Sequence, residues 1–109
     1  MLNDFWIKRF INEVVQKIVQ EFDPEQILLF GSRVNGTATE DSDLDVILVA
    51  ESFRYIPFVK RMSLALRKAE FEKHIDFICY SPDEFSKIQN SSAVIKDALE
   101  YGEIRPLYE

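Results

Sequence analysis

Few of the residues that build disulfide or zinc sites occur in this chain. Its 109 residues include one cysteine and one histidine. Cys79 therefore has no partner for an internal disulfide, and its neighbours Ile78 and Tyr80 predict a small, buried side chain in a reducing compartment. A disulfide-stapled fold and a cysteine-based site are both excluded.

The chain also lacks a long hydrophobic run and an excess of basic charge. No uncharged stretch approaches the roughly 20 residues that a membrane-spanning helix needs. Thirteen lysines and arginines stand against nineteen acidic residues, a net charge of -6, which disfavours attraction to a nucleic-acid backbone. We expect a soluble, cytoplasmic protein that binds neither membranes nor nucleic acid directly. A basic protein or a metal-bound nucleotide suits it better as a partner.

No repeat, low-complexity tract or linker divides the sequence, so we expect residues 1–109 to form a single domain. Apolar residues at helical spacing predict helices, and short apolar runs between turn residues predict strands. The expected helices are 2–22, 57–72, one that begins after Ser81, and 93–101; the expected strands are 26–30, 45–50, 74–80 and 104–108. This order is typical of an α+β fold, close to α/β, with a small mixed sheet packed against helices.

Local signals place several ends of these helices and strands. Ser81, followed by proline and then by Glu84, predicts a capped helix start. Gly102 suits a left-handed turn after the last helix, and Pro106 would confine the last strand to an edge of the sheet.

The stretch from 28 to 50, LLFGSRVNGTATEDSDLDVILVA, places acidic residues where a strand begins. Side chains alternate along a strand, so Asp43 and Asp45 point the same way, with α-carbons roughly 6.6 Å apart. Asp76 lies in another apolar run, and three carboxylates meet if the two strands adjoin. Crowded carboxylates resist ionisation unless a cation lies among them, and oxygen ligands favour Mg²⁺ or Mn²⁺.

Two other motifs fit this stretch poorly. The acidic residues of 41–45 begin like a calcium loop, but Val46 and Ser52 stand where that loop has glycine and its final glutamate. Residues 31–36 begin like a phosphate loop, but Thr37 replaces the required lysine. Both a calcium-binding EF-hand and a Walker site are excluded.

Gly31-Ser32, ten further residues, Asp43-x-Asp45 and a later Asp76 together resemble the signature of the polymerase-beta-like nucleotidyltransferase superfamily. Among its members the chain most resembles the minimal nucleotidyltransferases. The resemblance covers nearly the whole chain, from residue 2 to residue 108. One departure is Asn35, where the family often has an arginine that contacts phosphate.

The resemblance implies a polymerase-beta-like nucleotidyltransferase fold and a role for each matching residue. The catalytic and metal-binding residues would be Asp43, Asp45 and Asp76, and the nucleotide-binding residues Gly31, Ser32 and Arg33. Two Mg²⁺ ions, or Mn²⁺, would lie on the carboxylates, and ATP would be the substrate. Asp76 would lie beside the attacking hydroxyl and take its proton.

The resemblance also implies an acceptor. Minimal nucleotidyltransferases typically act as antitoxins that transfer AMP to a tyrosine of a partner HEPN-domain ribonuclease toxin. One alternative is an antitoxin that acts by binding only, with a vestigial site. Another is a nucleotidyltransferase that modifies a small molecule such as an antibiotic, which would normally need a further domain to hold its substrate.

Three polar residues near the motif carry simpler interpretations. Arg33 either binds phosphate or pairs with acidic residues of its own loop such as Glu40, and the sequence does not decide between the two. Asp41 is expected to face solvent. His74 shares a strand face with Asp76, but a single histidine near a strand start is expected to be structural.

Overall fold

A computed structural model describes residues 4–105, which form one four-stranded mixed sheet covered by helices. The strand order is β3-β2-β1-β4. The strands are β1 (Gln26–Phe30), β2 (Leu44–Val49), β3 (Ile75–Tyr80) and β4 (Glu103–Arg105). β1 pairs antiparallel with β2 and β4, whereas β2 and β3 are parallel. The predicted fold class, α+β with a small mixed sheet, is confirmed.

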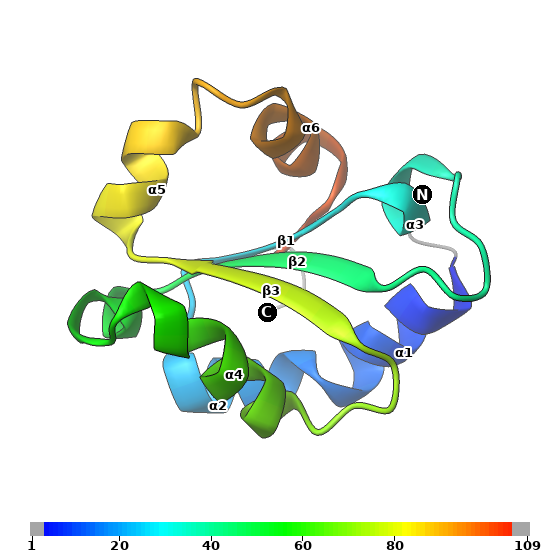
Figure 1. Cartoon of the computed structure of the whole chain (residues 1–109), viewed down its shortest axis with the longest axis horizontal. Helices are drawn as coiled ribbons and strands as arrows, with labels where there is room; N and C mark the ends of the chain where they lie inside the picture. Colours follow the sequence, from blue (N-terminus) through cyan, green and yellow to red (C-terminus); the bar gives the residue numbers. More distant parts are fainter. Residues whose placement is uncertain (1–3, 106–109) are drawn as a thin grey trace.

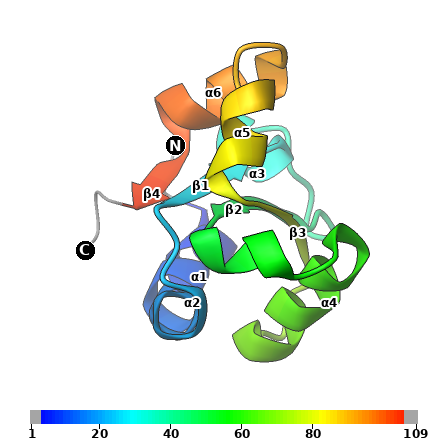
Figure 2. The same cartoon turned by 90° about the vertical axis from the view of Figure 1, so that its left-hand side faces the viewer.

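Helices cover both faces of this sheet (Figures 1 and 2). On one face lie α1 (Phe5–Glu13), α2 (Val15–Phe22) and α4 (Phe58–Ala69). On the other lie α5 (Pro82–Ile88) and α6 (Ala93–Tyr101). Because both faces are covered, the strands read as continuous apolar runs rather than as alternating ones.

The two sides of each strand belong to two separate hydrophobic cores. Ile27 and Leu29 of β1 pack with α1, α2 and α4, in the larger core. Leu28 between them packs with Ile47 of β2 and with Phe85 and Ile95 on the helices of the smaller core. The face of the sheet that carries the smaller core also carries the acidic residues of β2 and β3, because side chains at alternate positions share a face.

Two short helices were not predicted. α3 (Ser32–Asn35) and the 3-10 helix η1 (Glu51–Tyr55) lie in stretches that the sequence suggests are loops. Four or five residues are too few to show a helical period, which explains the omission. α3 follows β1 after Gly31 alone, and Gly31 lies against Asp45, so α3 begins beside the acidic end of β2.

Several predicted ends differ from the structure. The first helix is divided at Val14, and positions 2 and 3 of its predicted range lie outside the described residues. The last strand begins one residue early, and positions 106–108 of its predicted range lie outside the described residues, including the predicted edge proline. The predicted capping box at Ser81 and Glu84 is confirmed.

The left-handed turn predicted at Gly102 is wrong. Its φ is -119°, which any residue can adopt. Glycine is needed there for space instead, since a Cβ at this position would lie 1.8 Å from the carbonyl oxygen of Leu29. The Leu29 N–H donates to the Gly102 carbonyl over 2.7 Å, and this hydrogen bond holds the end of α6 against β1.

Among residues 4–105, no helix is both long enough and apolar enough to cross a membrane.

Candidate active site

The parallel pairing of β2 and β3 brings together acidic residues that are far apart in the sequence. Asp45 is the register partner of Asp76, so their side chains lie on the same face of the sheet. Asp43 immediately precedes β2 rather than lying within it. Its neighbour Leu44 donates its N–H to the carbonyl of His74 over 3.2 Å, which places the starts of the two strands side by side.

Asp43, His74 and Asp76 form a cluster that can hold a metal ion. One ligand atom from each lies within 4.8 Å of the others. The Nε2 atom of His74 lies 3.1 Å from Oδ1 of Asp76, which orients both side chains. Two carboxylates with an imidazole are a suitable donor set for a divalent cation.

His74 is the residue whose place sequence reasoning missed. Strand alternation does put it on the face of Asp76, but a structural role was expected. Its approach to Asp43 depends on the parallel register of two strands, which a single sequence does not reveal. The structure therefore adds an imidazole to the three predicted carboxylates.

Asp45 lies against Gly31 at the end of β1. A Cβ on Gly31 would lie 2.2 Å from the Oδ2 atom of Asp45, and the φ of Gly31 is +81°, a conformation that favours glycine. The family resemblance assigns this glycine to nucleotide binding. The structure shows a second reason for it, which is space for the carboxylate.

In the described part of the chain, no lysine or arginine neutralises the three carboxylates. Within residues 4–105, no lysine or arginine forms an ion pair with Asp43, Asp45 or Asp76. Partial burial raises the pKa of Asp45, and the charges of Asp76 and Asp43 raise it further. A divalent cation would relieve this repulsion, so the electrostatics of the site fit the donor set.

Ser32 begins α3, directly after Gly31. Its hydroxyl forms no hydrogen bond within the described part of the chain. The helix itself is closed by the Gly31 carbonyl, which accepts from the N–H groups of Val34 and Asn35 over 3.1 Å each. The hydroxyl is thus available to a ligand beside the carboxylates.

Arg33 is buried, and its guanidinium holds the loop that leads to the carboxylates. It donates to the backbone carbonyls of Ser42, Thr39 and Glu40 over 2.9, 2.9 and 3.1 Å. It also donates to Oδ2 of Asp4 over 2.8 Å, in an ion pair. Of the two interpretations of Arg33, the geometry favours pairing within the protein. Its partners are the backbone carbonyl of Glu40, rather than the Glu40 carboxylate, and the carboxylate of Asp4. Its role in nucleotide binding stays a prediction.

Two further residues of the motif region are exposed. Asp41 lies in solvent, as expected. Asn35 is exposed at the end of α3, and its Oδ1 accepts from the N–H and the hydroxyl of Thr37 over 3.1 and 2.6 Å.

A family model described as a nucleotidyltransferase domain matches residues 8–105. No curated protein sequence matches the chain. Among solved structures, a "putative nucleotidyltransferase" from Sulfolobus solfataricus is similar, with 24% identity and a TM-score of 0.57 over 72% of this chain and 70% of that one.

Two proteins of Arabidopsis thaliana are also similar in structure. BolA1 has 19% identity and a TM-score of 0.50, over 63% of this chain and 87% of that one. The BolA domain of SufE1 has 17% identity and a TM-score of 0.54, over 70% of this chain and 94% of that one. At these identities the three structures show a shared fold alone.

Proposed function

The chain belongs to the nucleotidyltransferase domain family, and from that premise we propose that it transfers AMP from ATP to a protein hydroxyl. Family membership itself supports nucleotidyl transfer from a nucleoside triphosphate with a divalent metal. The observation that carries the proposal is the meeting of Asp43, His74 and Asp76 beside Asp45. Such a cluster suits the negative charge that develops on pyrophosphate as it leaves and the nucleoside monophosphate passes to the acceptor oxygen.

We assign the metal to the carboxylates that the sequence singled out. Asp43, Asp45 and Asp76 would hold two ions, Mg²⁺ or Mn²⁺, with His74 beside them. When bound, the metal supplies positive charge against the phosphates. Asp76 takes the proton of the attacking hydroxyl, and His74 orients this carboxylate through their 3.1 Å contact.

The triphosphate is assigned to the turn between β1 and α3. The Ser32 hydroxyl, without a partner in the described residues, donates to a phosphate oxygen. Arg33 contributes indirectly, because its hydrogen bonds shape the loop from Thr39 to Ser42 that delivers Asp43 to the site.

For the acceptor, we propose a tyrosine of a HEPN-domain ribonuclease toxin, with this protein acting as the antitoxin. The net charge of -6 complements the basic surface that an RNA-binding enzyme needs. Tyr55, Phe58 and Val59, close together in the sequence, expose 85%, 55% and 86% of their surface, and exposed large apolar side chains of this kind support a protein partner.

Transfer to the partner is tested with α-labelled ATP and Mg²⁺. The protein is incubated with a HEPN-domain protein of the same genome, and labelled peptides are located by mass spectrometry. We expect the label on a tyrosine, and no label when that tyrosine is replaced by phenylalanine. Label on RNA or on a small molecule would support the proposed transferase activity and contradict the proposed antitoxin role.

The double variant Asp43→Asn with Asp45→Asn separates catalysis from binding. It removes two anionic ligands and keeps their size, so transfer should be lost while the fold and the partner interface survive. If this variant protected cells from the toxin as well as the unaltered protein does, the binding-only antitoxin would be the correct interpretation.

Metal binding is tested without any reaction. Mg²⁺ with a nonhydrolysable ATP analogue at 100 times its Kd should stabilise the protein by about 2.7 kcal/mol, measured as a rise in melting temperature. Calorimetry that detected no binding of metal or nucleotide at millimolar concentrations would falsify the assigned site.

A further inference from the structure

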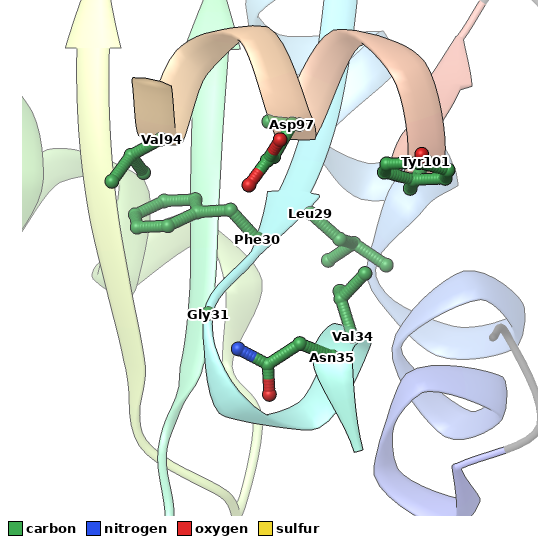
Figure 3. A pocket seen from close by; sticks show the side chains of 9 residues that line it. Leu29, Phe30, Gly31, Val34, Asn35, Val94, Asp97 and Tyr101 are labelled. Carbon is green, nitrogen blue, oxygen red and sulfur yellow. The ribbon is translucent and has the colours of Figure 1, made fainter. Parts of the chain in front are cut away.

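A pocket of about 530 Å³ lies between α6 and the turn that joins β1 to α3 (Figure 3). Its floor is the end of β1, including Phe30 and Gly31, and the adjoining Val34. Val94 and Tyr101 of α6 form part of its opposite wall. This volume is in the range of pockets that bind small molecules.

The pocket adjoins the carboxylates. Phe30 in its floor is the register partner of Asp45. Gly31, also in its floor, is the residue against which the Asp45 carboxylate packs. A ligand whose phosphates lie at Ser32 therefore has an adjacent space for the rest of the molecule.

The walls are suited to a flat, apolar ring. Val94 and Tyr101 expose 52% and 50% of their surface, and both line this pocket, so their apolar surfaces are accessible to a ligand. The rings of Tyr101 and Phe30 lie at its border (Figure 3). Aromatic faces of this kind stack on nucleobases.

One donor and one acceptor complete the lining. The Oδ1 atom of Asn35 is occupied by Thr37, so its NH₂ group is the polar group left for a ligand, and it points toward the pocket (Figure 3). Asp97 on α6 extends its carboxylate into the same space and forms no ion pair within residues 4–105.

We propose that this pocket binds the nucleobase of the substrate and selects a purine that carries an exocyclic amino group. The inference rests on the proposed function, which places the triphosphate next to the pocket. The amino group donates to the Asp97 carboxylate, and a ring nitrogen or oxygen accepts from the Asn35 amide. A keto oxygen in place of the amino group would meet the carboxylate and be repelled.

The test uses nucleosides, which have no phosphate and so report on the pocket alone. Metal-free protein is titrated with adenosine, guanosine and inosine while backbone amide signals are followed by NMR. We expect adenosine or guanosine to shift the signals of Asn35, Asp97 and Tyr101 and to bind about tenfold more tightly than inosine. Equal binding of all three, or shifts elsewhere in the protein, would overturn the inference.

Variants of α6 test the individual contacts. Tyr101→Ala should weaken adenosine binding about tenfold, whereas Tyr101→Phe, which keeps the ring, should change it less than about twofold. Asp97→Asn should remove the preference over inosine. Lys96→Ala, on the same helix but outside the lining, is the control and should bind normally. Melting temperatures verify that each variant is folded, and unchanged binding in a folded Tyr101→Ala would contradict the stacking role.

A parallel titration with Mg²⁺ and tripolyphosphate reports on the assigned phosphate and metal site. If tripolyphosphate fails to bind while adenosine binds in the pocket, the proposed function is wrong, but the inference that the pocket binds a purine stands. If tripolyphosphate binds and no nucleoside does, the proposed function remains and this inference is wrong.

Discussion

The charge of Asp45 is unfavourable in the metal-free protein. The side chain is partly buried, and the carboxylates of Asp76 and Asp43 lie near it. All three raise its pKa above the ordinary value of 3.8. The folded state therefore holds a proton on Asp45 at a pH at which the unfolded chain has released it.

This shift makes the stability of the metal-free protein depend on pH. The folded state binds more protons at Asp45, so the contribution of this one carboxyl to the free energy of unfolding is fully present below pH 3.8 and is lost as the pH rises through the raised pKa. Asp45→Asn removes the titrating group. We expect it to raise the melting temperature at pH 7 by roughly 2–5 °C, the range for less than about 1 kcal/mol after solvent screening.

Thermal denaturation at pH 4 and pH 7, with a metal chelator present, measures both effects. With Mg²⁺ in place of the chelator, the unaltered protein should have the higher melting temperature, since only it keeps all the proposed metal ligands. If Asp45→Asn were less stable than the unaltered protein when metal is absent from both, the result would contradict repulsion among the carboxylates.

Arg33 carries hydrogen bonds that a lysine cannot reproduce. A single ammonium cannot reach the Asp4 carboxylate and the carbonyls of Thr39, Glu40 and Ser42 at once. We expect Arg33→Lys to lower the free energy of unfolding by about 1–3 kcal/mol, because partly buried hydrogen bonds of the guanidinium are lost. Urea denaturation measures it. Arg67→Lys, at an exposed position of α4, is the matched control and should change little.

Ser32 gives a kinetic prediction that separates it from its acidic neighbours. Ser32→Ala should lose one hydrogen bond to a charged phosphate, about 1.5–3 kcal/mol, and lower kcat/KM correspondingly. Asp76→Asn should lower kcat/KM further, because it removes the proposed metal ligand and the proposed proton acceptor together. Asp41→Asn, in solvent, should be nearly silent. An inactive Asp41→Asn beside an active Asp76→Asn would show that the third carboxylate is misassigned.

At the scale of helices and strands, Gly102 determines where α6 stands. The helix end approaches β1 so closely that a methyl group on Gly102 would meet the Leu29 backbone. Gly36 after α3 is different: apart from its own chain neighbours, no atom of residues 4–105 lies within 4 Å of its Cβ position, and only its φ of +86° favours glycine.

The two glycines therefore predict different effects of substitution by alanine. Gly36→Ala should cost about 1–2 kcal/mol of stability from the left-handed backbone alone. Gly102→Ala should cost about 2–3 kcal/mol and also break the hydrogen bond from Leu29. Amide hydrogen exchange distinguishes them, since the Leu29 amide should lose protection only in Gly102→Ala. Equal protection in both variants would contradict this role of Gly102.

Much of this arrangement could be predicted from the sequence. The bounds of β1 were correct because a short apolar run lies between Asp23-Pro24 and Gly31, which end it clearly. The capping box of α5 was correct because its hydrogen bonds join residues only three positions apart. Signals of this kind are local, and a single sequence contains them.

The rest depends on contacts between distant segments. His74 meets Asp43 only through the register of β2 with β3, and Gly102 approaches Leu29 only in the assembled sheet. The motif singles out Asp43, Asp45 and Asp76, and their role in catalysis stays a prediction. Their convergence, and the imidazole added to them, required the structure.

At the scale of the whole molecule, the pairing of β2 with β3 brings together two pairs of site residues that are distant in the sequence. Asp43 and Asp45 precede the connection through η1 and α4, and His74 and Asp76 follow it. The cluster of Asp43, His74 and Asp76 thus forms only when two parts of the chain are paired in the correct register.

Cutting the chain within η1, in the exposed stretch at 54–55, would thus give two fragments with two ligand residues each. Neither fragment alone could bring together Asp43, His74 and Asp76. When the fragments are mixed, Mn²⁺ binding, measured by electron paramagnetic resonance, should return in proportion to the fraction of fragments that reassemble. The site would then act as a reporter of reassembly, and fragments that bound the ion separately would contradict its division between them.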